Sequence, residues 1–141
     1  MRTKKDSFNA YNIVFYDGVC RLCNVLVVWL IKRDRLKKLH FMSLQSPKAI
    51  SYLKSVNVNA LNLDSIIYTK SGHVYKKSAA VLCVLAELGG LWRLSCVFWV
   101  IPCFIRNLVY DLIAKFRYRI FGSYQSCLIP TKEIQDRFLD L

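Results

Sequence analysis

A strand-like run, a pair of cysteines and a helix-like run follow one another directly near the start of the chain. Residues 11–16 alternate in character and are rich in β-branched and aromatic side chains, which is typical of a β-strand. Cys20 and Cys23 follow, one helical turn apart. Beyond them, apolar side chains recur at intervals of three and four residues, which predicts an amphipathic helix. Its apolar face is expected to hold Leu26, Val27, Leu30 and Ile31, and its polar face Arg21, Asn24, Lys32 and Arg35.

The position of Cys20 at the start of this helix has a chemical consequence. The first turn of a helix presents unpaired N–H groups and the positive end of the helix dipole, and both favour a thiolate. We therefore expect Cys20, helped by the charge of Arg21, to be a nucleophile that attacks a disulfide. Cys23, on the apolar side of the helix, is the expected resolving thiol, which releases the substrate by closing a Cys20–Cys23 bond.

Asp17, three residues before Cys20, has two interpretations. Its carboxylate is placed to accept the proton of Cys23 as a general base during resolution. It is equally suited to cap the helix through hydrogen bonds to free N–H groups. The sequence does not separate the two.

Length and composition favour one domain with excess apolar surface. A chain of 141 residues suits a single compact core, and we expect one domain over 1–141, with a core over about 11–90 and a helical extension and tail over about 91–141. Hydrophobic residues make up 55%, and mean hydropathy is +0.28. The excess indicates either a large core or a surface that meets a partner or a membrane.

The formal net charge of +12 attracts nucleic acid, anionic lipid or acidic proteins alike. Lysines and arginines are scattered without a nucleic-acid motif, so no specific nucleic-acid partner is expected. The start of the chain is polar and gives no secretion signal. This predicts a cytoplasmic setting, with contact at the periphery of a membrane as a further option. In a reducing compartment the other cysteines, Cys83, Cys96, Cys103 and Cys127, are not expected to form a disulfide framework.

The order of elements indicates an α/β fold with the core order βαβαββα. Alternating strands and helices predict parallel pairing with helices packed on the sheet, and a closing hairpin adds an antiparallel strand. After the first helix we expect a strand at 39–43, a helix from Ser46-Pro47, a strand at 64–69, a turn at 70–72, a strand at 73–76 and a helix at 78–88 that ends at Gly89-Gly90.

The last third of the chain is expected to be helical. Residues 91–101 are apolar nearly all round, and after Pro102 a longer amphipathic stretch carries one apolar stripe. The uninterrupted apolar run, 94–105, is too short to span a bilayer and contains Pro102. We expect this extension to pack over one face of the sheet. In-plane contact with a membrane is the alternative.

Taken in order, these motifs resemble the DCC thiol-disulfide oxidoreductases of the thioredoxin-like superfamily. The resemblance is carried by Asp17, Cys20 and Cys23, and by residues 15–24, 77–82, 101–102, 109–114, 117–119, 121–122, Cys127 and Pro130. It implies a glutaredoxin-like fold and dithiol–disulfide exchange by Cys20 and Cys23 with a protein or small-molecule disulfide. The implied partners are such a disulfide or a small thiol, together with a cellular thiol reductant. No cofactor is implied beyond the cysteine pair.

Two comparisons with the wider superfamily concern substrate binding. Thioredoxin-like proteins place a cis-proline just before the third strand, whereas residues 62–65 contain no proline here. In glutaredoxin-like folds the start of the helix after the hairpin holds a carboxylate of glutathione. Lys77 and Ser78 occupy that place and, with Arg21, are candidate substrate-binding residues for glutathione as a co-substrate. The alternative is that Ser78 only caps its helix.

Two other classes of function remain open. A metal-binding module would use Cys20 and Cys23 with Cys127, His40 or His73, but the chain lacks the second close ligand pair usual in structural zinc sites, so no metal is expected. A thioredoxin-like interaction module would bind an anionic membrane or membrane protein through its basic, aromatic carboxyl-terminal helices.

Overall fold

The computed structural model describes residues 8–59, 65–123 and 132–139. Its centre is a four-stranded mixed sheet in the order β2-β1-β3-β4. The central strand β1 (Asn12–Tyr16) pairs parallel with β2 (Leu39–Ser43) and antiparallel with β3 (Ile67–Lys70), which continues into β4 (His73–Lys76). The element order βαβαββα predicted from the sequence is confirmed, as is the turn that joins β3 to β4.

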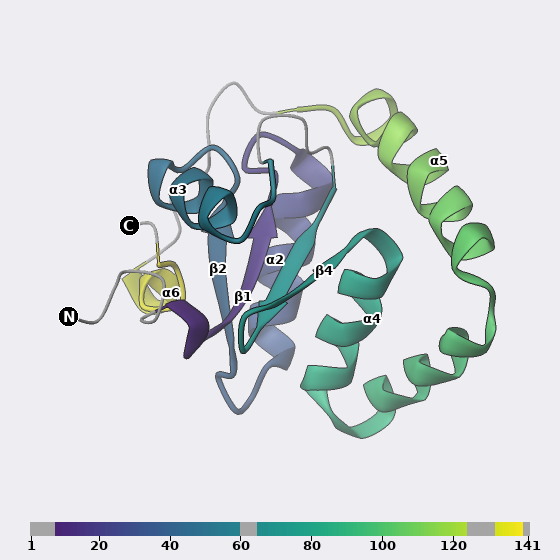
Figure 1. Ribbon diagram of the computed structural model, residues 1–141, viewed down its shortest axis with the longest axis horizontal. Helices are drawn as coiled ribbons and strands as arrows, with labels where there is room; N and C mark the ends of the chain where they lie inside the picture. The colour runs from purple at the N-terminus through teal and green to yellow at the C-terminus, as the bar shows by residue number, and fades with distance from the viewer. Residues whose placement is uncertain (1–7, 60–64, 124–131, 140–141) are drawn as a thin grey trace.

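Three helices cover the two faces of the sheet (Figure 1). Helices α2 (Arg21–Arg33) and α4 (Lys77–Leu88) pack on one face, and α3 (Pro47–Ser55) packs on the other. Because successive strand side chains point to opposite faces, β1 contributes to both cores. Val14 and Tyr16 face α2 and α4, while Ile13 and Phe15 face α3. Burial on both faces explains why β1 is nearly continuously apolar.

Helix α2 follows its predicted amphipathic pattern only in part. Val27 and Leu30 are buried as expected, but Leu26, assigned to the apolar face, is 44% exposed. Asn24, assigned to the polar face, is buried. Both assignments were wrong. Asn24 can be buried because its amide hydrogens bond to backbone carbonyls and are as well satisfied inside the protein as in water.

The carboxyl-terminal extension forms an arc beside α4 (Figure 1). The 3-10 helix η2 (Gly90–Val100) is followed, across a bend of 115°, by α5 (Cys103–Phe121). The expectation that this extension packs over one face of the sheet was wrong. Helices α2, α3 and α4 already occupy both faces, so η2 and α5 lie against α4 and α2 instead.

Within the described residues, no single helix is long and apolar enough to cross a membrane. Helices η2 and α5 reach the length and the apolar composition of a membrane span only when they are taken together, as a bent pair.

The last described residues return to the sheet. Helix α6 (Lys132–Gln135) lies on the side of the molecule away from α5 (Figure 1). Beyond it, the Phe41 N–H donates to the Arg137 carbonyl at 2.8 Å, and the Leu139 N–H donates to the Phe41 carbonyl at 3.0 Å. Phe138 joins the core beneath α2 and α4. The tail thus forms part of the same core as the sheet.

Candidate dithiol site

The two cysteines lie where the chain passes from β1 into α2. Cys20 is the N-cap of α2, and its Sγ accepts the Cys23 N–H at 3.4 Å. The cap geometry places the sulfur of Cys20 at the positive end of the helix, as the sequence predicted. Cys20 is fully buried, which the sequence did not indicate. Ser123, just after α5, pairs with Cys20 in an isolated antiparallel bridge.

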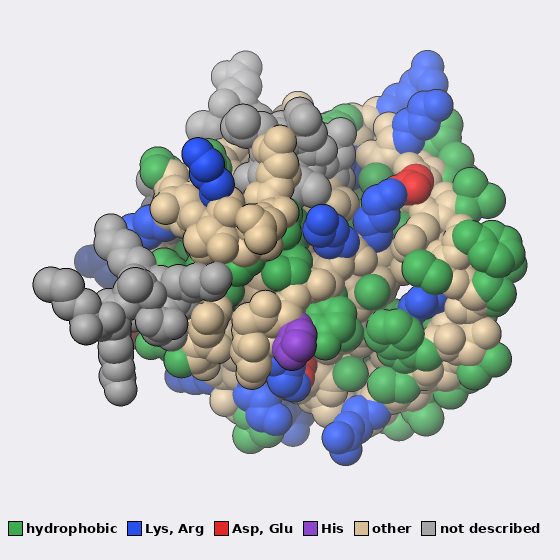
Figure 2. Space-filling model, in the orientation of Figure 1, with side chains coloured by type: hydrophobic (Ala, Val, Ile, Leu, Met, Phe, Trp, Pro, Cys, Tyr) green, Lys and Arg blue, Asp and Glu red, His purple; other side chains and the backbone are tan. Residues whose placement is uncertain are grey.

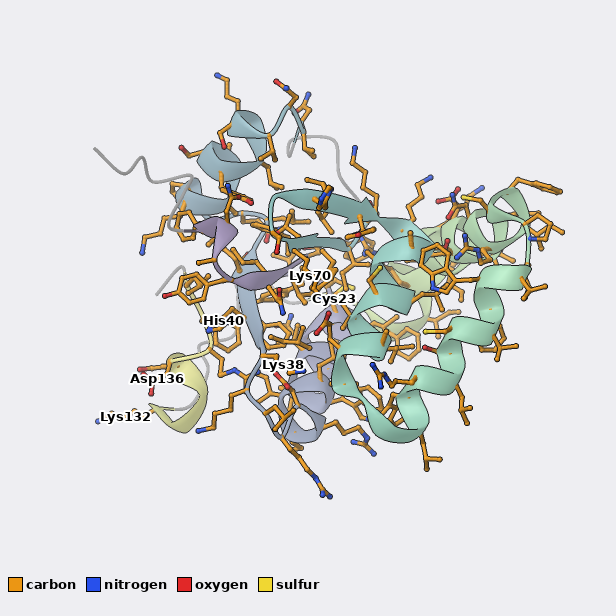
Figure 3. All side chains as sticks on the ribbon, turned by 60° about the horizontal axis from the view of Figure 1, so that its bottom comes forward. Cys23, Lys38, His40, Lys70, Lys132 and Asp136 are labelled. Atoms are coloured by element: carbon orange, nitrogen blue, oxygen red, sulfur yellow. The ribbon has the colours of Figure 1, made fainter. Side chains whose placement is uncertain are left out.

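Cys23 lies within the body of the molecule (Figure 3) and packs against the core beneath α2 and α4. Burial raises its pKa to about 12, and the hydrogen bond and negative charge of Cys20 act in the same direction. The nearby Asp17 charge also raises this pKa, whereas Arg117 opposes the shift. Cys23 is therefore held as a neutral thiol.

Arg117 links the cysteine pair to Asp17. Its Nη1 donates to Cys23 Sγ at 3.5 Å, and its Nη2 donates to Asp17 Oδ2 at 3.3 Å. The Arg117 and Asp17 side chains are only 4% and 8% exposed. A buried ion pair of this kind costs desolvation and requires further hydrogen bonds.

The Asp17 carboxylate receives those further bonds from two turns and from α5. Oδ1 accepts the Val19 N–H at 3.1 Å and Gln45 Nε2 at 2.8 Å, and Oδ2 accepts the Tyr118 hydroxyl as well as Arg117. Asp17 does not cap α2, since Cys20 occupies the N-cap. The role as a base toward Cys23 stays a prediction.

Two amide side chains hold the turn in place. Gln45 Oε1 accepts the Gly18 N–H at 3.0 Å while its amide nitrogen holds Asp17. Asn24 Nδ2 donates to the Gly18 and Cys20 carbonyls at 2.8 and 2.9 Å. The backbone that presents Cys20 is thereby fixed by the turn after β2 on one side and by α2 on the other.

The three candidate substrate-binding residues lie at the starts of two helices, Arg21 on α2 and Lys77 and Ser78 on α4. Arg21 is exposed at the first residue of α2. Lys77 Nζ pairs with Asp111 of α5 at 3.0 Å, and Ser78 Oγ donates to Asn107 of α5 at 2.5 Å. Ser78 does not cap α4, whose N-cap is Lys76. A glutathione carboxylate site at these residues stays a prediction, and here they hold α5 against α4.

Four residues of the site were missed by the sequence analysis: Asn24, Gln45, Arg117 and Tyr118. The only sequence signals for Asn24, Arg117 and Tyr118 were the family-like motifs at 15–24 and 117–119, and Gln45 had none. Cys127 and residues 62–64, where proline is missing, lie outside the described residues. Within the described part of the chain, no group of three or more His, Cys, Asp or Glu side chains is arranged to hold a metal.

The sheet order and the paired thiols at a helix start define a thioredoxin-like protein with a dithiol motif. The model of the DCC1-like thiol-disulfide oxidoreductase family matches residues 14–123, and the chain belongs to this family. The expected fold class and family are thus confirmed.

Two curated proteins illustrate the similarity. The uncharacterized protein YuxK of Bacillus subtilis (strain 168) is 41% identical over 127 residues, covering 90% of this chain and 93% of that protein. The DCC family protein At1g52590, chloroplastic, of Arabidopsis thaliana is 30% identical over 116 residues, covering 82% of this chain and 67% of that protein. No solved structure matches the chain.

Proposed function

We propose that this protein is a thiol-disulfide oxidoreductase that exchanges a Cys20–Cys23 dithiol with the disulfide of a protein or small molecule. The observation that carries the proposal is the cap geometry of α2, in which Cys20 Sγ accepts the Cys23 N–H at 3.4 Å. A sulfur in that position gains from the helix dipole as a thiolate. Membership of the family supports the same chemistry.

In the first step, the Cys20 thiolate attacks one sulfur of the substrate disulfide. A bond forms between Cys20 Sγ and that sulfur, the substrate S–S bond breaks, and the second substrate sulfur leaves as a thiolate that takes a proton from water. Because Cys20 is fully buried, attack on a substrate disulfide requires the chain around it to open.

The second step follows from the electrostatics of Cys23. Once Cys20 is bonded to substrate it carries no charge, so two of the influences that raise the pKa of Cys23 disappear while Arg117 remains. Cys23 then loses its proton, with Asp17 as the nearby base, and attacks Cys20 Sγ. The mixed disulfide breaks, the second substrate thiol is released, and two electrons have passed from the cysteine pair to the substrate.

A cellular thiol reductant closes the cycle by reducing the Cys20–Cys23 bond through the reverse steps. Glutathione is a candidate co-substrate, in which case its carboxylate would replace Asn107 or Asp111 as the partner of Ser78 or Lys77. No bound cofactor is needed, because the electrons reside in the two sulfurs.

Trapping with single-cysteine variants tests the proposal. Cys23→Ser is expected to accumulate a mixed disulfide through Cys20 with a model disulfide substrate, and Cys20→Ser is expected to lose exchange altogether. Cys103→Ser, which removes an exposed thiol at the start of α5, is the matched control and should behave as wild type. Exchange by Cys20→Ser at the wild-type rate would show that Cys20 is not the nucleophile.

The base role of Asp17 is tested by Asp17→Asn in rapid-mixing experiments that separate the two steps. The mixed disulfide is expected to form at nearly the wild-type rate. Its resolution by Cys23 is expected to be slower by about 10²-fold. The amide keeps the size of the side chain, so urea unfolding of the same variant reports any loss of stability separately. An equal slowing of both steps would contradict the base role.

A further inference from the structure

Helices η2 and α5 expose an unusually large apolar surface. None of the residues of η2 is buried, and α5 buries only Arg117. We call the exposed large apolar side chains of these two helices, together with Ile101 between them, the outer face. The outer face consists of Leu91, Trp92, Leu94, Val97, Phe98, Trp99, Val100, Ile101, Phe104, Ile105, Leu108, Val109, Leu112, Ile113, Ile120 and Phe121. Surfaces of this extent on monomeric proteins mark sites of interaction.

The orientation of α5 is set by polar contacts on its inner side. Asn107 accepts the Ser78 hydroxyl, Tyr110 Oη accepts the Ile66 N–H at 2.8 Å, and Asp111 pairs with Lys77. Arg117, six residues after Asp111, binds Asp17. These bonds turn the polar side of α5 toward the protein and leave its apolar stripe in water.

The charges beside the outer face are almost all positive. Arg93, Lys115 and Arg119 are exposed, and Arg106 lies over the Trp99 ring at 4.6 Å from its centroid. Asp111 is the only acidic residue between positions 89 and 123, and Lys77 neutralises it. Figure 2 shows apolar side chains gathered over the η2 and α5 side of the molecule, with Lys and Arg side chains beside them.

We propose that the outer face binds the surface of an anionic membrane, with η2 and α5 lying in the plane of the interface. Apolar side chains would enter the boundary between headgroups and acyl chains, and the flanking cations would contact anionic headgroups. Tryptophan beside arginine is suited to that boundary. A second copy of this chain is the weaker candidate, because each copy carries a net charge of +12 and would bring the same cations together.

The outer face extends to the dithiol site. Ile120 and Phe121 are 70% and 46% exposed at the end of α5, and Ser123, two residues later, pairs with Cys20. Docking would therefore place the Cys20 turn at the edge of the membrane surface. The docking proposal does not depend on the redox chemistry, because binding is measured without any disulfide.

Co-sedimentation of the full chain with vesicles tests the proposal. We expect binding to vesicles of phosphatidylglycerol and phosphatidylcholine, at least about tenfold weaker binding to pure phosphatidylcholine, and loss of affinity as salt is raised. Tryptophan fluorescence should shift to shorter wavelength on binding, because Trp99 is 45% exposed in the free protein. Absence of binding to the anionic vesicles would overturn the proposal.

Matched variants assign the binding to the outer face. Leu108→Ser with Leu112→Ser, and separately Lys115→Glu with Arg119→Glu, should each weaken vesicle binding at least about tenfold. Lys54→Glu is an exposed charge reversal on α3, away from the outer face. It should weaken vesicle binding less than about twofold. All four substituted residues of the outer variants are exposed, so circular dichroism should show an unchanged fold.

Two outcomes would contradict membrane docking. The first is vesicle binding that both outer variants retain in full. The second combines three results. The wild type does not bind vesicles, it forms a dimer in analytical ultracentrifugation, and the double variant Leu108→Ser, Leu112→Ser is a monomer. That second result would assign the outer face to self-association.

Discussion

Arg117 contacts the Cys23 thiol from 94 residues away in the sequence, and it also pairs with the buried Asp17 carboxylate. Replacing it with Gln removes the cation beside Asp17, whose carboxylate is only 8% exposed. We expect Arg117→Gln to lower the free energy of unfolding by about 3 kcal/mol, because the remaining carboxylate is left without its opposite charge. Urea unfolding measures the change.

The matched control for this prediction is Arg119→Gln on the same helix. Arg119 is exposed, so its replacement should change the unfolding free energy by about 0.5 kcal/mol or less. Equal losses for the two variants would mean that the Asp17–Arg117 pair contributes nothing specific to stability.

The pKa of Cys23 predicts loss of stability in alkali. The unfolded chain releases the Cys23 proton near its ordinary pKa of 9.0, whereas the folded protein holds it up to about 12. Between these values the unfolded state binds fewer protons, so stability falls as pH rises, by about 1.4 kcal/mol per pH unit at most. Denaturant melts at pH 8, 9 and 10 should show the fall.

Cys23→Ala should flatten that slope, because the variant has no proton to lose at this position. Tyr68, Tyr110 and Cys83 also have pKa values raised by burial and add slopes of the same sign. The difference between wild type and Cys23→Ala isolates the contribution of Cys23. Parallel slopes in the two proteins would contradict the shift.

At the scale of residues, the sequence identified the groups that act through local geometry. The strand-like run before Cys20 and the apolar periodicity after Cys23 together place Cys20 at a helix start. Arg117 was not identifiable in this way, because its role depends on how α5 docks. Asn24 was assigned to the wrong face because periodicity treats every amide as solvent-facing, whereas this one bonds to two carbonyls.

At the scale of elements, α5 shows the difference between predicting a helix and predicting its orientation. Its apolar stripe follows from the sequence, and the structure contains the helix at Cys103–Phe121. The stripe alone did not predict which side of α5 faces the protein. An apolar stripe turns inward only where the sheet still has an uncovered face to receive it. Both faces are filled by earlier helices, so polar side chains decide the orientation.

Tyr110 is the contact that best tests this docking. Its hydroxyl accepts the Ile66 N–H just before β3, and Tyr110→Phe leaves that donor without a partner. We expect a loss of about 1–3 kcal/mol in unfolding free energy and faster hydrogen exchange at the Ile66 amide. Leu112→Ala, on the exposed side of α5, should change neither by a comparable amount. Unchanged exchange at Ile66 would show that the bond is not formed in solution.

At the scale of the whole molecule, two buried ion pairs join distant parts of the chain. Asp17 pairs with Arg117 and Asp34 pairs with Arg137, at sequence separations of 100 and 103 residues. The acid in each pair follows an early element, and the arginine comes from the carboxyl-terminal third. Composition gives no sign of such pairing, because 21 basic residues offer too many partners for nine acids.

The Asp34–Arg137 pair holds the tail against the edge strand β2. Asp34 also accepts the Leu39 N–H at 2.7 Å, and Arg137 Nε donates to the Leu39 carbonyl at 2.9 Å. The Asp34 and Arg137 side chains are 2% and 9% exposed. The pair therefore closes the end of β2 and brings Phe138 into the core.

Arg137→Gln should consequently act on the tail and on the core together. Breaking a buried pair leaves Asp34 uncompensated, so we expect a loss of about 3 kcal/mol or more in unfolding free energy. The Leu139 amide, bonded to the Phe41 carbonyl, should exchange its hydrogen faster. Lys132→Gln, an exposed change in α6, is the control and should do neither. If Arg137→Gln instead loosened the Leu139 amide without lowering global stability, the tail would be a separately unfolding unit whose contact with β2 adds little to the core.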